Sequence, residues 1–234
     1  MSASRRAEPD DAAIALGLLA GLLAPPRCPA CRDRAPLDPG AGICAGCRGA
    51  FARQPARAVT VPLCGVVVAP LPYVPPATGL VAALKSGRVP AVAAGAAELI
   101  AEALGPPPAG AVLVPVGAAR LRRLRRGLDP AAEIAGALGA RLGLPSMPGL
   151  LRRCDSRPQR GRGRAQRLAD PPRFTLTAKP PPLALLVDDV VTTGATLRSC
   201  AESLRAAGCG IAGAVALAWA PAPGERLKDL IRPA

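Results

Sequence analysis

Two adjacent carboxylates and a threonine–glycine loop lie close together in the segment LALLVDDVVTTGATL at 183–197. A phosphate monoester needs converging hydrogen-bond donors and little steric bulk, which threonine hydroxyls, helix-start N–H groups and a glycine provide. Adjacent carboxylates can accept hydrogen bonds from a vicinal diol such as the hydroxyls of ribose. The segment therefore predicts a ribose 5-phosphate site. Its predicted contacts are Asp188, Asp189, Val191, Thr192, Thr193, Gly194, Ala195 and Thr196.

This segment has two competing interpretations. An ordinary strand-to-helix turn, capped by an aspartate, would need no ligand. A Walker B strand also places acids after apolar residues, but it requires a GxxxxGK[ST] loop elsewhere in the chain. None of the three lysines, Lys85, Lys179 and Lys228, follows a glycine, so the P-loop interpretation is excluded. The length of the combined pattern favours the phosphate site over the ordinary turn.

Four cysteines form two Cys-x-x-Cys knuckles, Cys28 with Cys31 and Cys44 with Cys47. Twelve residues separate the knuckles and include the turn signal DPG at 38–40. Such paired knuckles predict a zinc ribbon with a tetrahedral Cys₄ Zn²⁺ site. Four thiolates close the coordination sphere, so the predicted role is structural. Disulfides are the alternative, but they need an oxidising compartment.

The charge of the chain is concentrated in one part of the sequence. The 234 residues carry a net charge of +14, and between Arg120 and Arg167 thirteen arginines stand against three acidic residues. This local excess favours a polyanionic ligand, either a phosphate-rich small molecule or single-stranded DNA. With only four aromatic residues in the chain, a stacking platform for nucleic-acid bases is not expected. There is no histidine, so an imidazole can act neither as general base nor as metal ligand.

No apolar run reaches the roughly 18 residues that a membrane-spanning helix needs. The apolar stretch at 12–24 follows two arginines, but acidic residues interrupt its approach and no small-residue cleavage site follows. We interpret it as an amphipathic or buried helix and not as a signal peptide. A cytoplasmic protein is expected.

The elements that would position these residues alternate between strands and helices. Continuous apolar runs predict buried strands at 111–116, 183–187 and 211–218, and alanine-rich segments predict helices at 91–104, 130–142 and 196–207. Apolar strands alternating with helices indicate an α/β fold with a parallel sheet covered on both faces. The expected organisation is an N-terminal helix and zinc-ribbon module at 1–65, a larger domain at 66–222 and a tail at 223–234. Within the larger domain, 151–173 is predicted to be a long mobile loop.

The segment 184–196 resembles the signature of type I phosphoribosyltransferases, and other motifs resemble the ComF family of competence-associated proteins. The additional motifs are the cysteine knuckles, Tyr73, Leu84-Lys85, Val114-Pro115-Val116, Arg126-Gly127, and Gln159 with Arg167. The resemblance implies a type I phosphoribosyltransferase-like sheet that binds 5-phosphoribosyl-1-pyrophosphate with Mg²⁺ and transfers the phosphoribosyl group to an unidentified acceptor. Where the family has Asn-Gln, this chain has Asp129-Pro130, which affects the acceptor side.

Open parallel sheets bind ligands at the carboxyl ends of their strands. This rule and the family resemblance together assign roles to further residues. Asp188, Asp189, Lys85 and Arg126 are the catalytic candidates. Pyrophosphate is expected on Val116, Gly117, Arg120 and Arg126. The loop at 151–173 corresponds to the mobile hood of type I phosphoribosyltransferases, and its expected ligand contacts are Gln159 and Arg167. An alternative function is DNA binding during DNA uptake, through the zinc ribbon and the arginine-rich segment, with a regulatory phosphoribosyl site. That alternative predicts retention of single-stranded DNA that falls steeply with salt.

Overall fold

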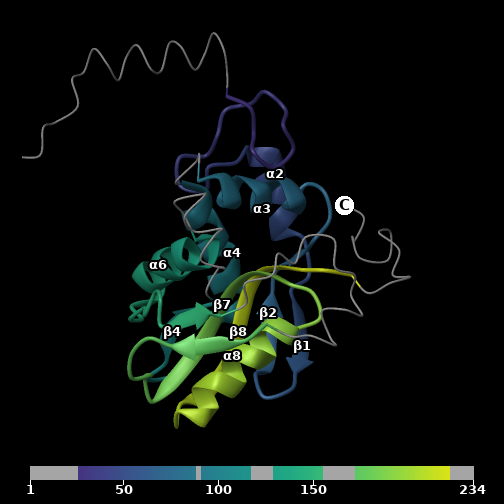
Figure 1. Cartoon of the computed structure of the whole chain (residues 1–234). Helices are drawn as coiled ribbons and strands as arrows, with labels where there is room; N and C mark the ends of the chain where they lie inside the picture. Colours follow the sequence, from purple (N-terminus) through teal and green to yellow (C-terminus); the bar gives the residue numbers. More distant parts are fainter. Residues whose placement is uncertain (1–25, 88–90, 117–128, 155–171, 222–234) are drawn as a thin grey trace, which may run out of the picture.

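The central feature of the computed structural model is a mixed, mostly parallel β-sheet (Figure 1). The structure describes residues 26–87, 91–116, 129–154 and 172–221. The sheet has the order β1-β2-β8-β7-β4, with β3 also paired to β8, and every pairing except β1 with β2 is parallel. Its strands are β1 (Arg57–Val61), β2 (Gly65–Ala69), β3 (Leu71–Pro72), β4 (Val112–Pro115), β7 (Leu183–Val191) and β8 (Gly210–Trp219).

The strands at the centre of the sheet are buried on both faces. In β7, Leu185 and Val187 pack into one hydrophobic cluster, while Ala184 and Leu186 pack into the cluster on the opposite face. Successive side chains of a strand point to opposite faces, so a strand covered on both sides must be apolar throughout. The predicted α/β architecture with a parallel sheet flanked by helices is confirmed. The antiparallel β1–β2 hairpin at the sheet edge was not predicted.

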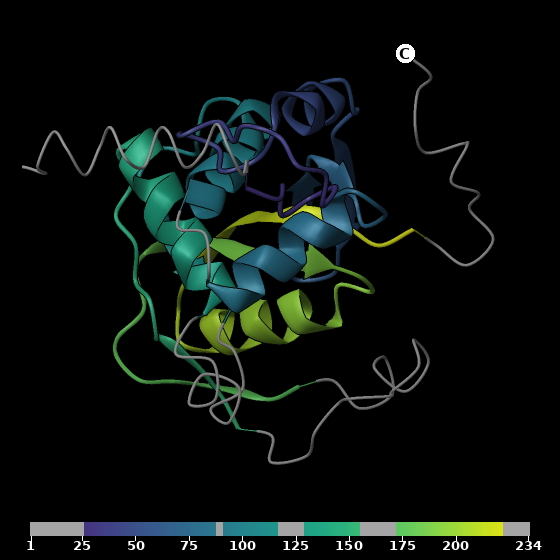
Figure 2. The same ribbon diagram turned by 90° about the horizontal axis from the view of Figure 1, so that it is seen from above.

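Helices cover the two faces of the sheet (Figure 2). On one face lie α3 (Ala77–Ser86), α4 (Ala91–Leu104) and α6 (Pro130–Leu142); on the other lies α8 (Ala195–Ala206). The boundaries of α4 and α6 match the predicted helices, because Gly105 and Gly143, both with positive φ, follow their last residues. Helix α8 begins at Ala195, one residue before the predicted start.

The cysteine-bearing segment packs directly onto the helices of the larger part. Cys28, Ile43 and Phe51 belong to the same hydrophobic cluster as Leu80 of α3 and Leu217 of β8. This segment contains isolated bridges and one helix, α2 (Ala45–Ala52), which follows the second knuckle. The expected boundary at residue 65 runs within the central sheet, because β1 and β2 pair across it.

Two glycines allow this close packing. A Cβ atom at Gly79 of α3 would lie 2.2 Å from the carbonyl oxygen of Ala30, and one at Gly95 of α4 would lie 2.7 Å from that of Ala41. Both obstacles are backbone atoms, which a rotamer change cannot move. The absence of a side chain at these two positions therefore lets the cysteine-bearing segment pack closely against α3 and α4.

We expect Gly79→Ala to lower the free energy of unfolding by about 1–3 kcal/mol, because the added methyl forces helix α3 away from the first knuckle. Gly136→Ala in α6 is the matched control, since no atom lies within 4 Å of a Cβ there. This control should stabilise the helix by roughly 0.5–1 kcal/mol. Urea unfolding of both variants measures the difference, and equal midpoints would contradict the proposed packing.

A short antiparallel pair corrects the prediction for 151–173. Strand β5 (Leu151–Arg153) pairs with β6 (Phe174–Leu176), and the Cys154 N–H continues the ladder by donating to the Arg173 carbonyl oxygen. Leu151 and Phe174 are buried in the cluster that contains α8. The start of the predicted loop is therefore a strand that packs on the domain. Three-residue strands are too short to give a recognisable alternation in the sequence.

Candidate functional site

The two predicted carboxylates lie at the carboxyl end of the sheet. Strand β7 continues past the predicted end at Val187 to Val191. Strand β4 stops at Pro115, opposite Val187, so Asp188 and Asp189 extend beyond their neighbour on that side. On the other side Asp188 remains paired with Ala216 of β8. The aspartates are thus held by regular backbone pairing at the edge where open parallel sheets bind ligands.

Asp188 is held in an environment that disfavours its charge. Burial, and then the negative charge of Asp189, raise the pKa of Asp188 well above its ordinary value of 3.8. Asp188 Oδ1 accepts a hydrogen bond from the Asp189 N–H at 2.8 Å, which opposes this shift but does not cancel it. An ion or a donor group that binds the pair would lower the free-energy cost of ionising both carboxyls.

Lys85 reaches the same site from the last turn of α3. Its Nζ lies 2.8 Å from Asp189 Oδ2, and both side chains are partly exposed. In the sequence, Lys85 was connected to the site only by family resemblance. The structure brings it into contact with one of the two aspartates, so Lys85, Asp188 and Asp189 form one cluster of ionisable groups.

The threonine–glycine loop connects β7 to α8. Gly194 has φ +72°, and a Cβ atom there would lie 2.6 Å from Val61 Cγ2. Both the backbone conformation and the close approach of β1 therefore require glycine at this position. Thr193 Oγ1 accepts from the Ala195 N–H at 3.3 Å. Helix geometry leaves the first N–H groups of α8 without intrahelical acceptors, as an anion site requires.

A pocket of about 180 Å³ lies beside this loop. Thr192, Thr193 and Gly194 form one wall, and Arg57 of β1 and Trp219 of β8 form another. The guanidinium of Arg57 lies over the Trp219 ring, 4.4 Å from its centroid. The sequence analysis missed Arg57 and Trp219, because β1 was not predicted and an isolated arginine carries no motif. Trp219, which directly follows the predicted strand 211–218, was the sequence signal that could have indicated a site residue here.

Several predicted contacts lie outside the described residues: Gly117, Arg120, Arg126, Gln159 and Arg167. Val116 is described, and it corrects one expectation. Its N–H donates to the Val187 carbonyl oxygen at 2.8 Å, so this amide belongs to the sheet and is not available to pyrophosphate. Ten of the thirteen arginines between 120 and 167 also lie outside the described residues.

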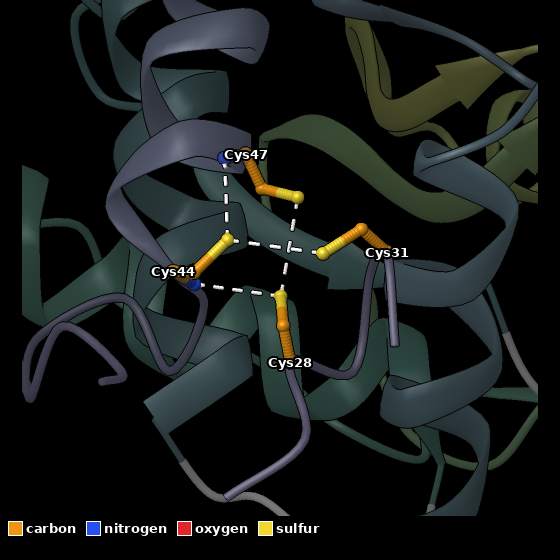
Figure 3. A group of neighbouring side chains, drawn as sticks. All are labelled: Cys28, Cys31, Cys44 and Cys47. Carbon is orange, nitrogen blue, oxygen red and sulfur yellow. Dashed lines mark hydrogen bonds between the residues drawn. The ribbon is translucent and has the colours of Figure 1, made fainter. Parts of the chain in front are cut away.

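The four knuckle cysteines converge on one point (Figure 3), and their sulfur atoms all lie within 4.8 Å of one another. Cys28 Sγ is 3.9 Å from Cys47 Sγ, and Cys31 Sγ is 3.8 Å from Cys44 Sγ. A zinc ion with Zn–S bonds of about 2.3 Å holds its sulfurs about 3.8 Å apart at tetrahedral geometry. The donor set and the spacing therefore fit a structural Zn²⁺, which the cluster could hold.

Backbone N–H groups surround the sulfurs. The Cys44 N–H donates to Cys28 Sγ at 3.4 Å, and the Cys47 N–H donates to Cys44 Sγ at 3.5 Å. Burial raises the pKa of Cys28, but N–H donors from Cys44, Cys31 and Ala30 outweigh it and lower the pKa to about 7. Burial and the neighbouring sulfurs raise the pKa of Cys47. A cation at the centre would resolve the mutual repulsion of these thiolates.

All eight cysteines are described, and all are free thiols. The sulfur separations in the cluster are far longer than a disulfide bond of about 2.05 Å. Cys64 is buried in the opposite hydrophobic cluster, together with Cys200, and Cys154 is exposed. Cys64 therefore does not belong to the knuckles.

No protein-family model matches the chain, and its sequence matches no curated protein. Among the described residues, no helix is both long and apolar enough to cross a membrane. The indications of function therefore lie in the geometry of the carboxylate pair, the threonine–glycine loop and the pocket.

Proposed function

We propose that this protein is a ComF-like, type I phosphoribosyltransferase-like protein. It binds 5-phosphoribosyl-1-pyrophosphate with its Mg²⁺ and transfers the phosphoribosyl group to a nucleophilic acceptor. One observation carries the proposal. The carboxylate pair, Lys85 and the threonine–glycine loop occupy one edge of a parallel sheet, with a pocket beside the loop. Acceptors for a diol and donors for a phosphate then follow one another where β7 leads into α8.

Each group has a distinct task in this proposal. Asp188 and Asp189 accept hydrogen bonds from the ribose hydroxyls, and the loop with the first turn of α8 holds the 5-phosphate. Lys85 keeps Asp189 oriented, at 2.8 Å, and adds positive charge beside the site. During transfer the bond between C1 and the pyrophosphate oxygen breaks, and its electron pair leaves with pyrophosphate. A new bond forms between C1 and the acceptor nucleophile, which loses its proton.

Stabilisation of the leaving group is the main requirement of this reaction. The Mg²⁺ that accompanies the substrate neutralises part of the pyrophosphate charge. The arginines between 120 and 126 are candidates for the remainder, following the sequence motif. The Cys₄ cluster, with a structural Zn²⁺, supports α3 and thereby Lys85. A reducing cytoplasm, in which thiolates remain available for zinc, fits this proposal.

A direct test incubates the protein with 5-phosphoribosyl-1-pyrophosphate, Mg²⁺ and fractionated cell metabolites, and follows pyrophosphate release and new products by mass spectrometry. We expect release that depends on one metabolite. Asp189→Asn should slow it by about a hundredfold or more, because a ribose contact and the Lys85 ion pair are both lost. Glu202→Gln, an exposed acid-to-amide change in α8, is the matched control and should leave the rate unchanged.

The proposal would be overturned by two results together. These are the absence of any metabolite-dependent release and the absence of measurable affinity for 5-phosphoribosyl-1-pyrophosphate in calorimetry. Binding without release would instead identify a protein that senses the compound.

A further inference from the structure

The pocket beside the threonine–glycine loop has two walls, and only one of them belongs to the loop. The other is formed by Arg57 of β1 and Trp219 of β8. These residues are far apart in sequence and meet because β2 joins β1 to β8 in the sheet. Neither residue belongs to the pattern that predicted the phosphate contacts.

Trp219 carries an unpaired donor in this wall. The side chain is 6% exposed, and its indole Nε1 is buried without a hydrogen-bond partner among the described residues. Buried indole N–H groups nearly always have an acceptor, because burying an unpaired donor is costly. Because Trp219 lines the pocket, a ligand that binds there is a candidate acceptor for this N–H.

Arg57 presents a positive charge in the same wall. Its guanidinium lies 4.4 Å from the centroid of the Trp219 ring, so the indole limits the orientations that the planar group can take. A guanidinium held in this way is suited to two parallel hydrogen bonds with a phosphate. Among the described residues that line the pocket, Arg57 is the single charged one.

The opposite wall supplies the remaining donors. Thr192 and Thr193 line the pocket together with Gly194, where the chain enters α8. The pocket volume of about 180 Å³ is several times the roughly 30 Å³ that one water molecule occupies in the liquid. A phosphate group fits this space.

We propose that Arg57 and Trp219 form the second half of a phosphate-monoester subsite and set its selectivity for a phosphorylated pentose. The Trp219 N–H and the Arg57 guanidinium donate to the phosphate oxygens from one side, and the loop donates from the other. The inference rests on the proposed function, since the phosphate is taken to be the 5-phosphate of the phosphoribosyl group.

The test uses ribose 5-phosphate and the full-length chain. Trp219 is the single tryptophan of the protein, so its fluorescence reports directly on the pocket. We expect ribose 5-phosphate to change Trp219 emission saturably, while ribose at the same concentration leaves it unchanged. In calorimetry, Arg57→Gln should weaken ribose 5-phosphate binding by about tenfold or more. Trp219→Phe, which keeps the aromatic face and removes the N–H, should weaken it by about threefold to tenfold.

Arg141→Gln removes the same charge from an exposed position in the last turn of α6 and should bind ribose 5-phosphate like the wild type. Wild-type affinity in both pocket variants, or no response of Trp219 to ribose 5-phosphate, would overturn the inference. If 5-phosphoribosyl-1-pyrophosphate still binds in that case, the proposed function stands without this subsite. If ribose 5-phosphate binds through Arg57 but 5-phosphoribosyl-1-pyrophosphate shows neither measurable affinity nor metabolite-dependent release of pyrophosphate, the subsite stands and the proposed transferase function fails.

Discussion

Replacing Cys28 with serine should release the bound metal and lower the unfolding midpoint by roughly 10 °C or more. Cys28 is fully buried, and its sulfur lies 3.9 Å from that of Cys47 and accepts the Cys44 N–H. A serine hydroxyl is a poor zinc ligand, and a structural zinc site contributes its binding free energy directly to folding. Because the cluster shares one hydrophobic core with α3 and α4, the loss should extend beyond the knuckles.

Elemental analysis and thermal unfolding of the purified protein measure this effect. We expect one equivalent of zinc in the wild type and in Cys154→Ser, an exposed cysteine outside the cluster that serves as the matched control. A strong chelator should lower the wild-type midpoint toward that of Cys28→Ser. An unchanged zinc content in Cys28→Ser, or no metal in the wild type, would contradict the assignment.

Asp188→Asn should abolish the binding of 5-phosphoribosyl-1-pyrophosphate and at the same time make the free protein more stable. The two effects have one cause, because burial and the adjacent Asp189 disfavour the charged form of Asp188. Asparagine is uncharged and keeps the oxygen that accepts the Asp189 N–H. The charge that is unfavourable in the free protein is the one that the ribose hydroxyls would use. Functional sites often retain such destabilising groups.

The pH dependence follows from the direction of the shift. The pKa of Asp188 in the native state lies above its unfolded value, near 3.8. Below the unfolded value the group is protonated in both states and no destabilisation arises. As the pH rises through the native pKa, the folded protein is progressively destabilised relative to the unfolded chain. The midpoint of Asp188→Asn should therefore approach that of the wild type in acid and exceed it near neutral pH.

We expect a difference of at least about 2 °C at neutral pH, since 1 kcal/mol shifts the midpoint of a domain of this size by about 2–4 °C. Calorimetry with 5-phosphoribosyl-1-pyrophosphate and Mg²⁺ measures the loss of binding, which should exceed about a hundredfold. Glu202→Gln should change neither quantity, because Glu202 is exposed on α8. Undiminished affinity in Asp188→Asn would refute the role of the carboxylate pair. If the difference in unfolding midpoint between Asp188→Asn and the wild type does not change with pH, the raised pKa of Asp188 is refuted.

Local sequence patterns predicted the parts of the fold that depend on neighbouring residues. Helices α4 and α6 were predicted with their boundaries, because glycines at their ends and apolar periodicity are local signals. The four cysteines were predicted as one cluster from their spacing alone, since two knuckles joined by a turn can converge without help from the rest of the chain. The short strands β5 and β6 were missed, because each pairs with a segment far from it in the chain. Strand β1 was also missed, although its partner β2 follows it directly in the sequence.

The residues of the site also divide into those predicted from local sequence and those placed by tertiary structure. The sequence by itself determined that Asp188, Asp189 and the threonine–glycine loop follow a buried strand and precede a helix. Tertiary structure alone decided that Lys85 contacts Asp189, and that Arg57 and Trp219 complete the pocket. The order of strands in the sheet brings these residues together, and that order depends on hydrogen bonds between segments far apart in the chain. The raised pKa of Asp188 has the same origin, because burial is a property of the packed molecule and not of any segment.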